Sequence, residues 1–195
     1  MKRVCVFCGS SAGIRPEYGF AAQALTTELV RRGLGLVYGG GNVGLMGLLA
    51  DSMLAAGGEV IGVIPQSLLE REVGHRGVTE LRVVDTMHQR KALMNDLSDA
   101  FIALPGGFGT LEEFFEILTW SQLGIHAKPC GLLNVSGYYD DLMAMLDHAV
   151  TEHFLRPTYR ELVIADVEAG SLVQRLASVA SAQTRKPVNA ARNFP

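Results

Sequence analysis

Short apolar runs recur along the whole chain, and longer amphipathic stretches or loops separate them. Most runs lack the alternation of polar and apolar residues that marks a strand with one face in water. Uninterrupted apolar runs of this length are typical of parallel strands that are buried on both faces. We therefore predict strands at residues 4–7, 34–38, 60–64, 81–84, 100–104, 130–134 and 162–165.

Parallel strands need long crossover connections, and most stretches between the runs have the length and pattern of helices. Pro16 suits a first helical turn, and Gly33 follows two arginines where a helix is expected to end. The predicted fold class is α/β, a single-domain Rossmann-like three-layer sandwich around a mostly parallel, doubly wound sheet. The predicted helices cover residues 16–32, 43–56, 88–97, 110–123, 138–153 and 168–179.

A length of 195 residues fits one domain with a single core, and no repeat or linker divides the chain. We assign residues 1–181 to this domain and expect the polar residues 182–195 to form a flexible tail. The net charge of -3 leaves no broad basic field, which argues against nucleic acid or a membrane surface as partner. Because the apolar run after Arg3 is too short for a signal peptide, we expect a cytoplasmic protein.

The cysteines and histidines show no pattern of a disulfide framework or a metal site. Cys5 and Cys8 form a C-x-x-C pair, but residues three apart on a strand face opposite sides of the sheet. We interpret both, together with Cys130, as buried core thiols. The histidines lack the spacings of metal ligands, so we predict neither a metal nor a cofactor.

Glycine-rich loops follow three of the predicted strands, at the ends where open parallel sheets bind ligands. The second loop, residues 39–44, matches G-x-G-x-x-G, the pattern of dinucleotide-binding folds. However, it follows the second strand instead of the first, and the next acidic residue suited to a ribose, Glu59, precedes the next strand. We prefer a phosphate or ribose contact, or a tight helix–strand crossing. The candidates in the first two loops are Gly9, Ser10, Gly39, Gly40 and Gly41.

The third loop, residues 105–110, has the sequence PGGFGT and leads into a predicted helix. Its glycines allow backbone N–H groups to converge on an anion at the helix start. No Lys-Ser or Lys-Thr pair follows, so a monophosphate suits this loop better than a triphosphate with magnesium. Thr110 and Glu113 also match a capping box, which would explain both residues without a ligand, and the two interpretations are compatible.

Arg90 and Lys91 lie near the start of the helix that precedes this third loop. The helix dipole disfavours positive charge at that end, so their placement indicates an anionic partner. The alternative is a solvated pair on an exposed helix face. Glu116 shares a helix face with Glu112 and Glu113, where it either tunes their charge or is solvated.

The motif Met87-His88-Gln89-Arg90-Lys91, followed by PGGFGTLEE at residues 105–113, resembles the LOG ("lonely guy") family of cytokinin riboside 5'-monophosphate phosphoribohydrolases. The family pattern P-G-G-x-G-T-x-x-E is present in full. The resemblance begins at residues 8–10 and continues through residues 38–41 and 131–134. It covers most of the chain except the C-terminal tail.

This resemblance implies hydrolysis of the N-glycosidic bond of an adenine-type nucleoside 5'-monophosphate, releasing the base and ribose 5-phosphate. It also implies a homodimer and assigns catalysis to Arg90 and Glu113. The apolar helices at residues 43–56 and 110–123 are candidates for the interface, and their periodicity fits burial in the core equally well. The substrate contacts that it implies are Glu72, Arg90, Lys91, Gly107, Phe108, Gly109, Thr110, Leu111, Glu112, Glu113 and Thr119.

Simple physical chemistry agrees with these roles. A carboxylate such as Glu113 stabilises the oxocarbenium-like ribose and aligns or deprotonates a water molecule. We expect it to be charged near the positive helix end, which leaves the proton donor to the base unassigned. Arginine stays protonated, so Arg90 clamps phosphate or orients Glu113 and the substrate hydroxyls, and Lys91 adds charge more loosely.

Two other functions compete with the hydrolase. Relatives with this motif carry the label lysine decarboxylase, but a pyridoxal enzyme needs a Schiff-base lysine in a pocket, and the lysines are few. A noncatalytic nucleotide or molybdenum-cofactor carrier needs a phosphate grip but no carboxylate at the ribose. The preferred base stays open, because Met46, Met87 or Phe108 can each form the wall at its N6 substituent, and AMP itself is a candidate.

Overall fold

The computed structural model describes residues 1–69 and 74–184, and within them seven parallel strands form one sheet. The strand order is β4-β3-β2-β1-β5-β6-β7, so β1 lies in the middle and pairs with both β2 and β5. The predicted doubly wound α/β fold is confirmed. The strands are β1 (Arg3–Phe7), β2 (Gly35–Tyr38), β3 (Val60–Pro65), β4 (Glu80–Val84), β5 (Ala100–Ala103), β6 (Cys130–Leu133) and β7 (Val163–Asp166).

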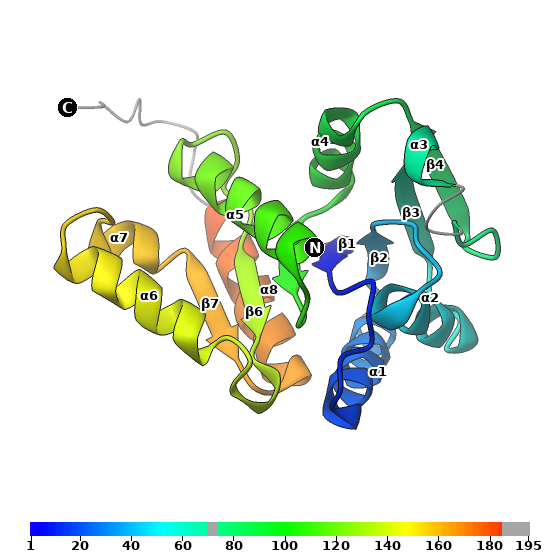
Figure 1. Ribbon diagram of the computed structural model, residues 1–195, viewed down its shortest axis with the longest axis horizontal. Coiled ribbons are helices and arrows are strands. Elements are labelled where there is room, and N and C mark those ends of the chain that lie inside the picture. The colour runs from blue at the N-terminus through cyan, green and yellow to red at the C-terminus, as the bar shows by residue number, and fades with distance from the viewer. Residues whose placement is uncertain (70–73, 185–195) are drawn as a thin grey trace.

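Helices connect successive strands and cover both faces of the sheet (Figure 1). They are α1 (Pro16–Arg31), α2 (Gly44–Ala55), α3 (Gln66–Leu69), α4 (Met87–Leu97), α5 (Phe108–Gln122), α6 (Asp140–Thr151), α7 (Pro157–Arg160) and α8 (Ala169–Thr184), with a short 3-10 helix η1 (Val135–Gly137) before α6. Pro16 occupies the first turn of α1, and Gly33 follows its C-cap with a positive φ of 65°, as predicted.

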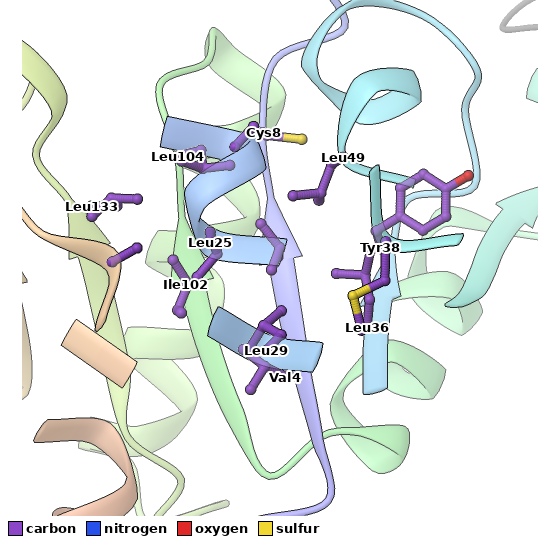
Figure 2. Packing of buried hydrophobic residues seen from close by; sticks show 14 of the residues in the cluster. Val4, Cys8, Leu25, Leu29, Leu36, Tyr38, Leu49, Ile102, Leu104 and Leu133 are labelled. Atoms are coloured by element: carbon purple, nitrogen blue, oxygen red, sulfur yellow. The ribbon is translucent and has the colours of Figure 1, made fainter. Parts of the chain in front are cut away.

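Each face of the sheet carries its own hydrophobic core. On one face α1, α2 and α8 pack on the strands. Figure 2 shows Leu25 and Leu29 of α1 near Ile102 and Val4 of the sheet, and Leu49 of α2 between Cys8 and Tyr38. The other face is covered by α4, α5 and α6, whose apolar side chains form a second cluster. Each fully buried leucine contributes about 1.5–3 kcal/mol, so these cores hold the strand ends in fixed positions.

Strand β1 shows why the runs lack polar alternation. Val4 and Val6 belong to the first cluster, whereas Cys5 and Phe7 belong to the second. Cys8, just after the strand, returns to the first cluster. The cysteines of the C-x-x-C pair therefore lie on opposite faces, buried and unbridged, as predicted.

Several predicted boundaries change in the structure. Helix α5 begins at Phe108, two residues before the predicted start at residue 110, and α6 begins at Asp140, two residues after the predicted start at residue 138, because a turn separates it from η1. Residues 182–184, which we expected in the tail, continue α8. The single-turn helices α3 and α7 were not predicted, because four residues are too few to show helical periodicity.

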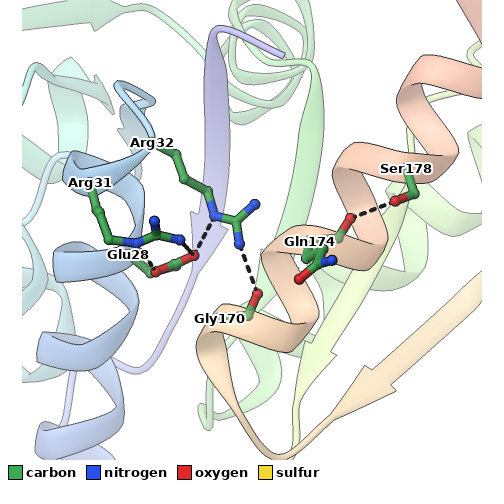
Figure 3. Close-up of polar contacts among 6 residues, drawn as sticks. All are labelled: Glu28, Arg31, Arg32, Gly170, Gln174 and Ser178. Atoms are coloured by element: carbon green, nitrogen blue, oxygen red, sulfur yellow. Dashed lines mark hydrogen bonds and ion pairs between the residues drawn. The ribbon is translucent and has the colours of Figure 1, made fainter.

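The end of α1 is joined to the start of α8 by charged side chains (Figure 3). Glu28 accepts hydrogen bonds from Arg31 and Arg32 on its own helix, and Arg32 Nη2 also donates to the Gly170 carbonyl oxygen at 3.3 Å. The Arg31 and Arg32 guanidinium groups lower the pKa of Glu28 to about 2. This network links two helices that share the first core.

Among residues 1–69 and 74–184, we find no helix long and apolar enough to cross a lipid bilayer.

Candidate functional site

The loop after β1 and the loop after β5 meet where the sheet changes winding direction, between those two strands. The amide of Gly9 donates a hydrogen bond to the Pro105 carbonyl oxygen at 3.1 Å. A Cβ atom on Gly9 would lie 3.4 Å from the Gly106 Cα atom, so these backbones touch. Topological switch points of this kind are where open α/β sheets bind ligands.

The loop after β2 closes onto the same place. The amide of Leu45, at the start of α2, donates to the Gly9 carbonyl oxygen at 3.1 Å. A side chain on Gly44, whose φ is +59°, would place its Cβ atom 2.3 Å from the carbonyl carbon of Ser10. The sequence needs glycine at position 44 because the loops after β1 and β2 pass each other without room for a side chain. The two glycine-rich loops therefore converge at one place.

The N-terminus of α5 lies at this convergence. Gly107 is the N-cap, and the first helical hydrogen bond runs from the Leu111 amide to the Gly107 carbonyl oxygen at 3.1 Å. The amides of Phe108, Gly109 and Thr110 therefore precede the first helical bond, as at any helix start. We call these three amides together with the Gly107 amide the amide cradle. Such a group attracts anions.

The predicted capping box at Thr110 is wrong. The N-cap is Gly107, which has no side chain to form a cap, and Thr110 is the third residue of the helix. The Thr110 side chain is buried against Gly106, where an added Cβ atom would lie 2.1 Å from Thr110 Oγ1. Thr110 therefore packs the loop against the helix, and this packing requires glycine at position 106.

Arg90 extends from α4 beneath the carboxyl ends of β2 and β3. Its Nε donates to the Val63 carbonyl oxygen at 3.1 Å, and its Nη2 donates to the Gly39 carbonyl oxygen at 3.2 Å. Only 6% of the residue is exposed, so the solvated alternative for Arg90 is wrong. Because two donors bind strand ends, the guanidinium plane is fixed before any ligand arrives.

Glu113 faces this guanidinium from α5. Its Oε1 lies 3.5 Å from Arg90 Nη2, and the Glu113 side chain is 10% exposed. Glu113 lies in the second turn of α5, beyond the range in which a helix dipole stabilises charge strongly. The Glu113 carboxylate therefore contacts the Arg90 guanidinium and lies beyond the helix end that we predicted to act on it.

Lys91 contacts two other carboxylates of α5. Its Nζ lies 2.5 Å from Glu112 Oε1 and 2.9 Å from Glu116 Oε1. Burial lowers the pKa of Lys91, but the hydrogen bonds to Glu112 and Glu116 outweigh it, and the pKa is raised. Neither Lys91 nor Glu116 is a solvated surface charge; the two carboxylates hold the lysine and tie α4 to α5.

The site also carries a buried thiol. Burial raises the pKa of Cys8, and the negative charge of Glu113 raises it further. The same two causes raise the pKa of Cys5. Both cysteines therefore stay as neutral thiols next to the carboxylate, and neither is activated as a nucleophile.

The glycines after β2 have packing roles of their own. A Cβ atom on Gly39 would lie 2.1 Å from Arg90 Nη2. Gly40 has a φ of +77° and accepts a hydrogen bond from the amide of His75, while Gly41 forms an antiparallel bridge with Gly74. These contacts match the tight crossing that we predicted as one alternative; a substrate contact by these glycines stays a prediction.

The other predicted substrate contacts are unevenly placed. Gly107, Phe108 and Gly109 are exposed at the cradle, and Phe108 is 94% exposed. Leu111 is half-buried on the next turn. Thr119 is exposed but lies roughly 16 Å along α5 from Phe108 at the usual rise per residue, so one protomer does not bring it to the cradle. Glu72 lies outside the described residues.

Sequence reasoning missed two supports of the site. Thr86 and Gln89 form a capping box at the start of α4, which fixes the helix that carries Arg90. The T-x-x-Q pattern was a signal for it. The hydroxyls of Tyr138 and Tyr139 donate to carbonyl oxygens of the loop before α5. No local pattern marks these tyrosines, because their partners are more than thirty residues away.

A pocket of about 410 Å³ lies at the opposite edge of the sheet, at the amino ends of β1, β2 and β3. Its lining includes Arg3 and Glu59, which pair with each other at 2.8 Å. Because Arg3 and Glu59 bind each other, their charges are already paired and do not favour a charged ligand in this pocket. Among the described residues, no group of three or more histidine, cysteine or acidic side chains is placed to hold a metal ion.

Known proteins resemble this chain over most of its length. Residues 46–176 match a family model described as possible lysine decarboxylase. Cytokinin riboside 5'-monophosphate phosphoribohydrolase LOG1 of Arabidopsis thaliana is 55% identical over 175 residues, which cover 90% of this chain and 82% of that protein. Cytokinin riboside 5'-monophosphate phosphoribohydrolase LOG3 of the same plant is 53% identical over 184 residues, which cover 94% of this chain and 86% of that protein.

Solved structures share the architecture at lower identity. The molybdenum cofactor carrier protein of Chlamydomonas reinhardtii superimposes with a TM-score of 0.69 over 92% of this chain and 98% of its own, at 19% identity. At this identity the likeness establishes the fold alone.

Proposed function

The chain belongs to the family of the cytokinin riboside 5'-monophosphate phosphoribohydrolases, and we propose that it hydrolyses the N-glycosidic bond of adenine-type nucleoside 5'-monophosphates. The products are the free base and ribose 5-phosphate. The observation that carries the assignment to this site is the buried pair of Arg90 and Glu113 next to an open amide cradle. This pair supplies a fixed carboxylate, and the cradle supplies the phosphate grip.

The 5'-phosphate binds at the amide cradle. The amides of Phe108, Gly109 and Thr110 carry the partial positive charge of the helix start. Gly107 and Gly109 leave open space in which an anion can approach the backbone, since no atom of the described residues lies within 4 Å of either Cβ position. A single phosphate fits this arrangement without a lysine or a metal.

Glu113 acts on the ribose. It lies roughly 7 Å along α5 from Phe108, a separation that a ribose 5-phosphate bridges. Its carboxylate stabilises the positive charge that develops at the anomeric carbon and accepts a proton from the attacking water. The N-glycosidic bond breaks, its electron pair leaves with the base, and the water oxygen bonds to the anomeric carbon. The departing base takes up one proton, and Glu113 releases the proton that it took from water, so the reaction balances as free base and ribose 5-phosphate.

Arg90 orients Glu113. Its Nε and Nη2 already bind the carbonyl oxygens of Val63 and Gly39, so the guanidinium does not swing out to follow a phosphate. It places one positive charge next to Glu113 and holds the carboxylate in position. Of the two roles that we predicted for Arg90, this geometry supports orientation over a phosphate clamp.

The lysine contacts argue against amino-acid decarboxylation. Lys91 is held by two carboxylates, and Lys128 donates to the Asn95 carbonyl oxygen at 2.6 Å. A Schiff base needs a lysine that can reach an aldehyde as a neutral amine, and the raised pKa of Lys91 opposes that form. We therefore prefer hydrolysis to the activity that names the family model.

We also propose a homodimer in which α5 contributes to the interface. Thr119 is too far along α5 to reach the cradle of its own protomer, so a role in substrate binding requires the cradle of a second copy. Phe108 and Phe115 expose apolar surface on the same helix, whereas the apolar residues of α2 are mostly buried in the core. Light scattering coupled to size-exclusion chromatography measures the mass of the assembly directly.

A cytoplasmic location of the protein stays a prediction.

The proposed activity is tested by incubating the purified protein with AMP, N6-isopentenyl-AMP and the matching riboside. Free base and ribose 5-phosphate are measured over time. We expect release from the monophosphates and much slower release from the riboside, because the riboside lacks the group that the cradle binds. Equal rates for the riboside and its monophosphate would show that the cradle contributes nothing.

The carrier function is separated by Glu113→Ala. A hydrolase loses turnover in this variant, whereas a noncatalytic carrier has no turnover to lose and keeps its nucleotide affinity. Tight nucleotide binding by the unmodified protein with no release of base from any monophosphate would favour the carrier.

A further inference from the structure

Two consecutive tyrosines hold the backbone that leads into the amide cradle. Tyr138 Oη donates to the Gly106 carbonyl oxygen at 2.7 Å, and Tyr139 Oη donates to the Leu104 carbonyl oxygen at 2.6 Å. Both tyrosines follow η1, the turn after β6, so they reach the loop from a different part of the chain. They lie outside the motif that identifies the site.

The tyrosines are themselves fixed. Tyr139 is 1% exposed, and its amide donates to Asn134 Oδ1 at 2.7 Å. The Tyr138 ring packs edge-on against the Tyr139 ring, with centroids 5.0 Å apart, and against the Tyr18 ring of α1 at 5.8 Å. The Tyr138 hydroxyl is therefore a rigid donor, although 42% of the residue is exposed.

The bond to Gly106 controls the direction of one cradle amide. The Gly106 carbonyl and the Gly107 N–H belong to the same planar peptide unit, and in a trans peptide they point in opposite directions. Because the carbonyl is held by Tyr138, the Gly107 N–H is turned away from that tyrosine. Two successive glycines have the widest choice of backbone angles, so this peptide needs an external constraint to keep one orientation.

We propose that Tyr138 is a positioning residue for the amide cradle, orienting the Gly106–Gly107 peptide so that the Gly107 N–H faces the substrate phosphate. The inference rests on the proposed function, because it assumes that the phosphate binds at the cradle. Tyr138 does not touch the reacting atoms, and its effect falls on phosphate affinity rather than on bond cleavage.

Tyr138→Phe removes only the hydroxyl oxygen and keeps the ring between Tyr18 and Tyr139. We expect the KM for AMP to rise about three- to tenfold, as for the loss of one hydrogen bond, with kcat changed by less than about twofold. Inhibition by inorganic phosphate weakens by a similar factor, while inhibition by adenine does not change. Tyr159→Phe, on α7 beside Arg156, is the matched control, and we expect it to behave as the unmodified protein.

An unchanged KM and phosphate inhibition in Tyr138→Phe would overturn the inference. So would an equal loss of phosphate and adenine inhibition, because a general loss of structure affects both. If the unmodified protein hydrolyses no monophosphate, the proposed function fails, but calorimetric titration with phosphate still decides the role of Tyr138. Weaker phosphate binding by Tyr138→Phe than by Tyr159→Phe supports it, and equal binding contradicts it.

Discussion

Arg90 Nη2 lies 3.5 Å from Glu113 Oε1, with both side chains no more than 10% exposed. The two residues come from different helices, α4 and α5, and meet under the carboxyl ends of the central strands. Burial makes this pair sensitive to the loss of either partner, because a buried charge without its counter-charge is costly. Their separate contributions are distinguishable by substitution.

Glu113→Gln keeps the size of the side chain and removes its charge. We expect kcat to fall about 100- to 1000-fold, the usual scale for losing one electrostatic contact to a transition state. The KM for AMP changes little, since the cradle amides are untouched. Steady-state kinetics measure both constants, and a fall in kcat of less than about tenfold would contradict a catalytic role.

Arg90→Lys keeps a positive charge but loses the planar group that binds Val63 and Gly39 simultaneously. We expect lower turnover together with a free energy of unfolding reduced by about 1–3 kcal/mol, because buried carbonyl groups lose a donor. Urea denaturation gives the stability. A variant with normal stability and reduced turnover would show that the backbone bonds of Arg90 are unimportant.

Two glycine substitutions separate ligand space from packing. In Gly107→Ala the new methyl group meets no described atom within 4 Å, so we expect an unchanged melting temperature and a raised KM for AMP. In Gly39→Ala the methyl group lies 2.1 Å from Arg90 Nη2, so we expect a lower melting temperature and lost turnover. Thermal denaturation gives the melting temperature of each variant, and steady-state kinetics give the KM. A lower melting temperature with an unchanged KM in Gly107→Ala would contradict the open space at the amide cradle.

Three residues are candidates to contact the N6 substituent of the base. Phe108 is almost fully exposed, at 94%, whereas Met46 is buried and Met87 contacts Arg90. We expect Phe108→Ala to lower kcat/KM for N6-isopentenyl-AMP about tenfold more than for AMP, the value of roughly two buried methylene groups. Phe154→Ala, at a residue 91% exposed after α6, is the control. Equal effects on both substrates would exclude Phe108 from the base pocket.

The stability of the α1–α8 junction depends on pH through Glu28. Since Arg31 and Arg32 lower its pKa to about 2, the charged carboxylate stabilises the folded state above its ordinary pKa of 4.5, and this contribution disappears as the pH falls toward 2. Glu28→Gln is expected to cost about 1 kcal/mol at neutral pH and progressively less below pH 4.5. Urea denaturation across pH measures it, with exposed Glu152→Gln as control. A difference independent of pH would contradict the ion pair.

Local sequence patterns were sufficient to predict the sheet, the parallel direction of its strands and the convergence of the glycine-rich loops. Runs such as residues 100–104 are apolar on both faces because helices cover both faces, and this information is present in the run itself. The position of the cradle follows from the rule that parallel strands end at the same edge. Arg90 and Glu113 were linked by the family resemblance of residues 87–91 and 105–113, and in the structure the two side chains are in contact.

The roles of individual side chains needed tertiary structure. The pattern at Thr110 and Glu113 fits a capping box, but the structure starts α5 at Phe108 because Gly106 and Thr110 pack against each other. Adjacent cations in sequence have separate partners in space: Arg90 binds strand ends, and Lys91 binds α5.

The amino-acid sequence by itself determined the order of strands and helices, the burial of the sheet and the chemistry available at its loops, because hydrophobic period and glycine placement act over a few residues. Only the tertiary structure decided the other partners: Arg90 with the strand ends, Lys91 with Glu116, and Tyr138 with Gly106. Such pairs join segments that are distant along the chain, and their geometry depends on how two helices pack on a shared sheet.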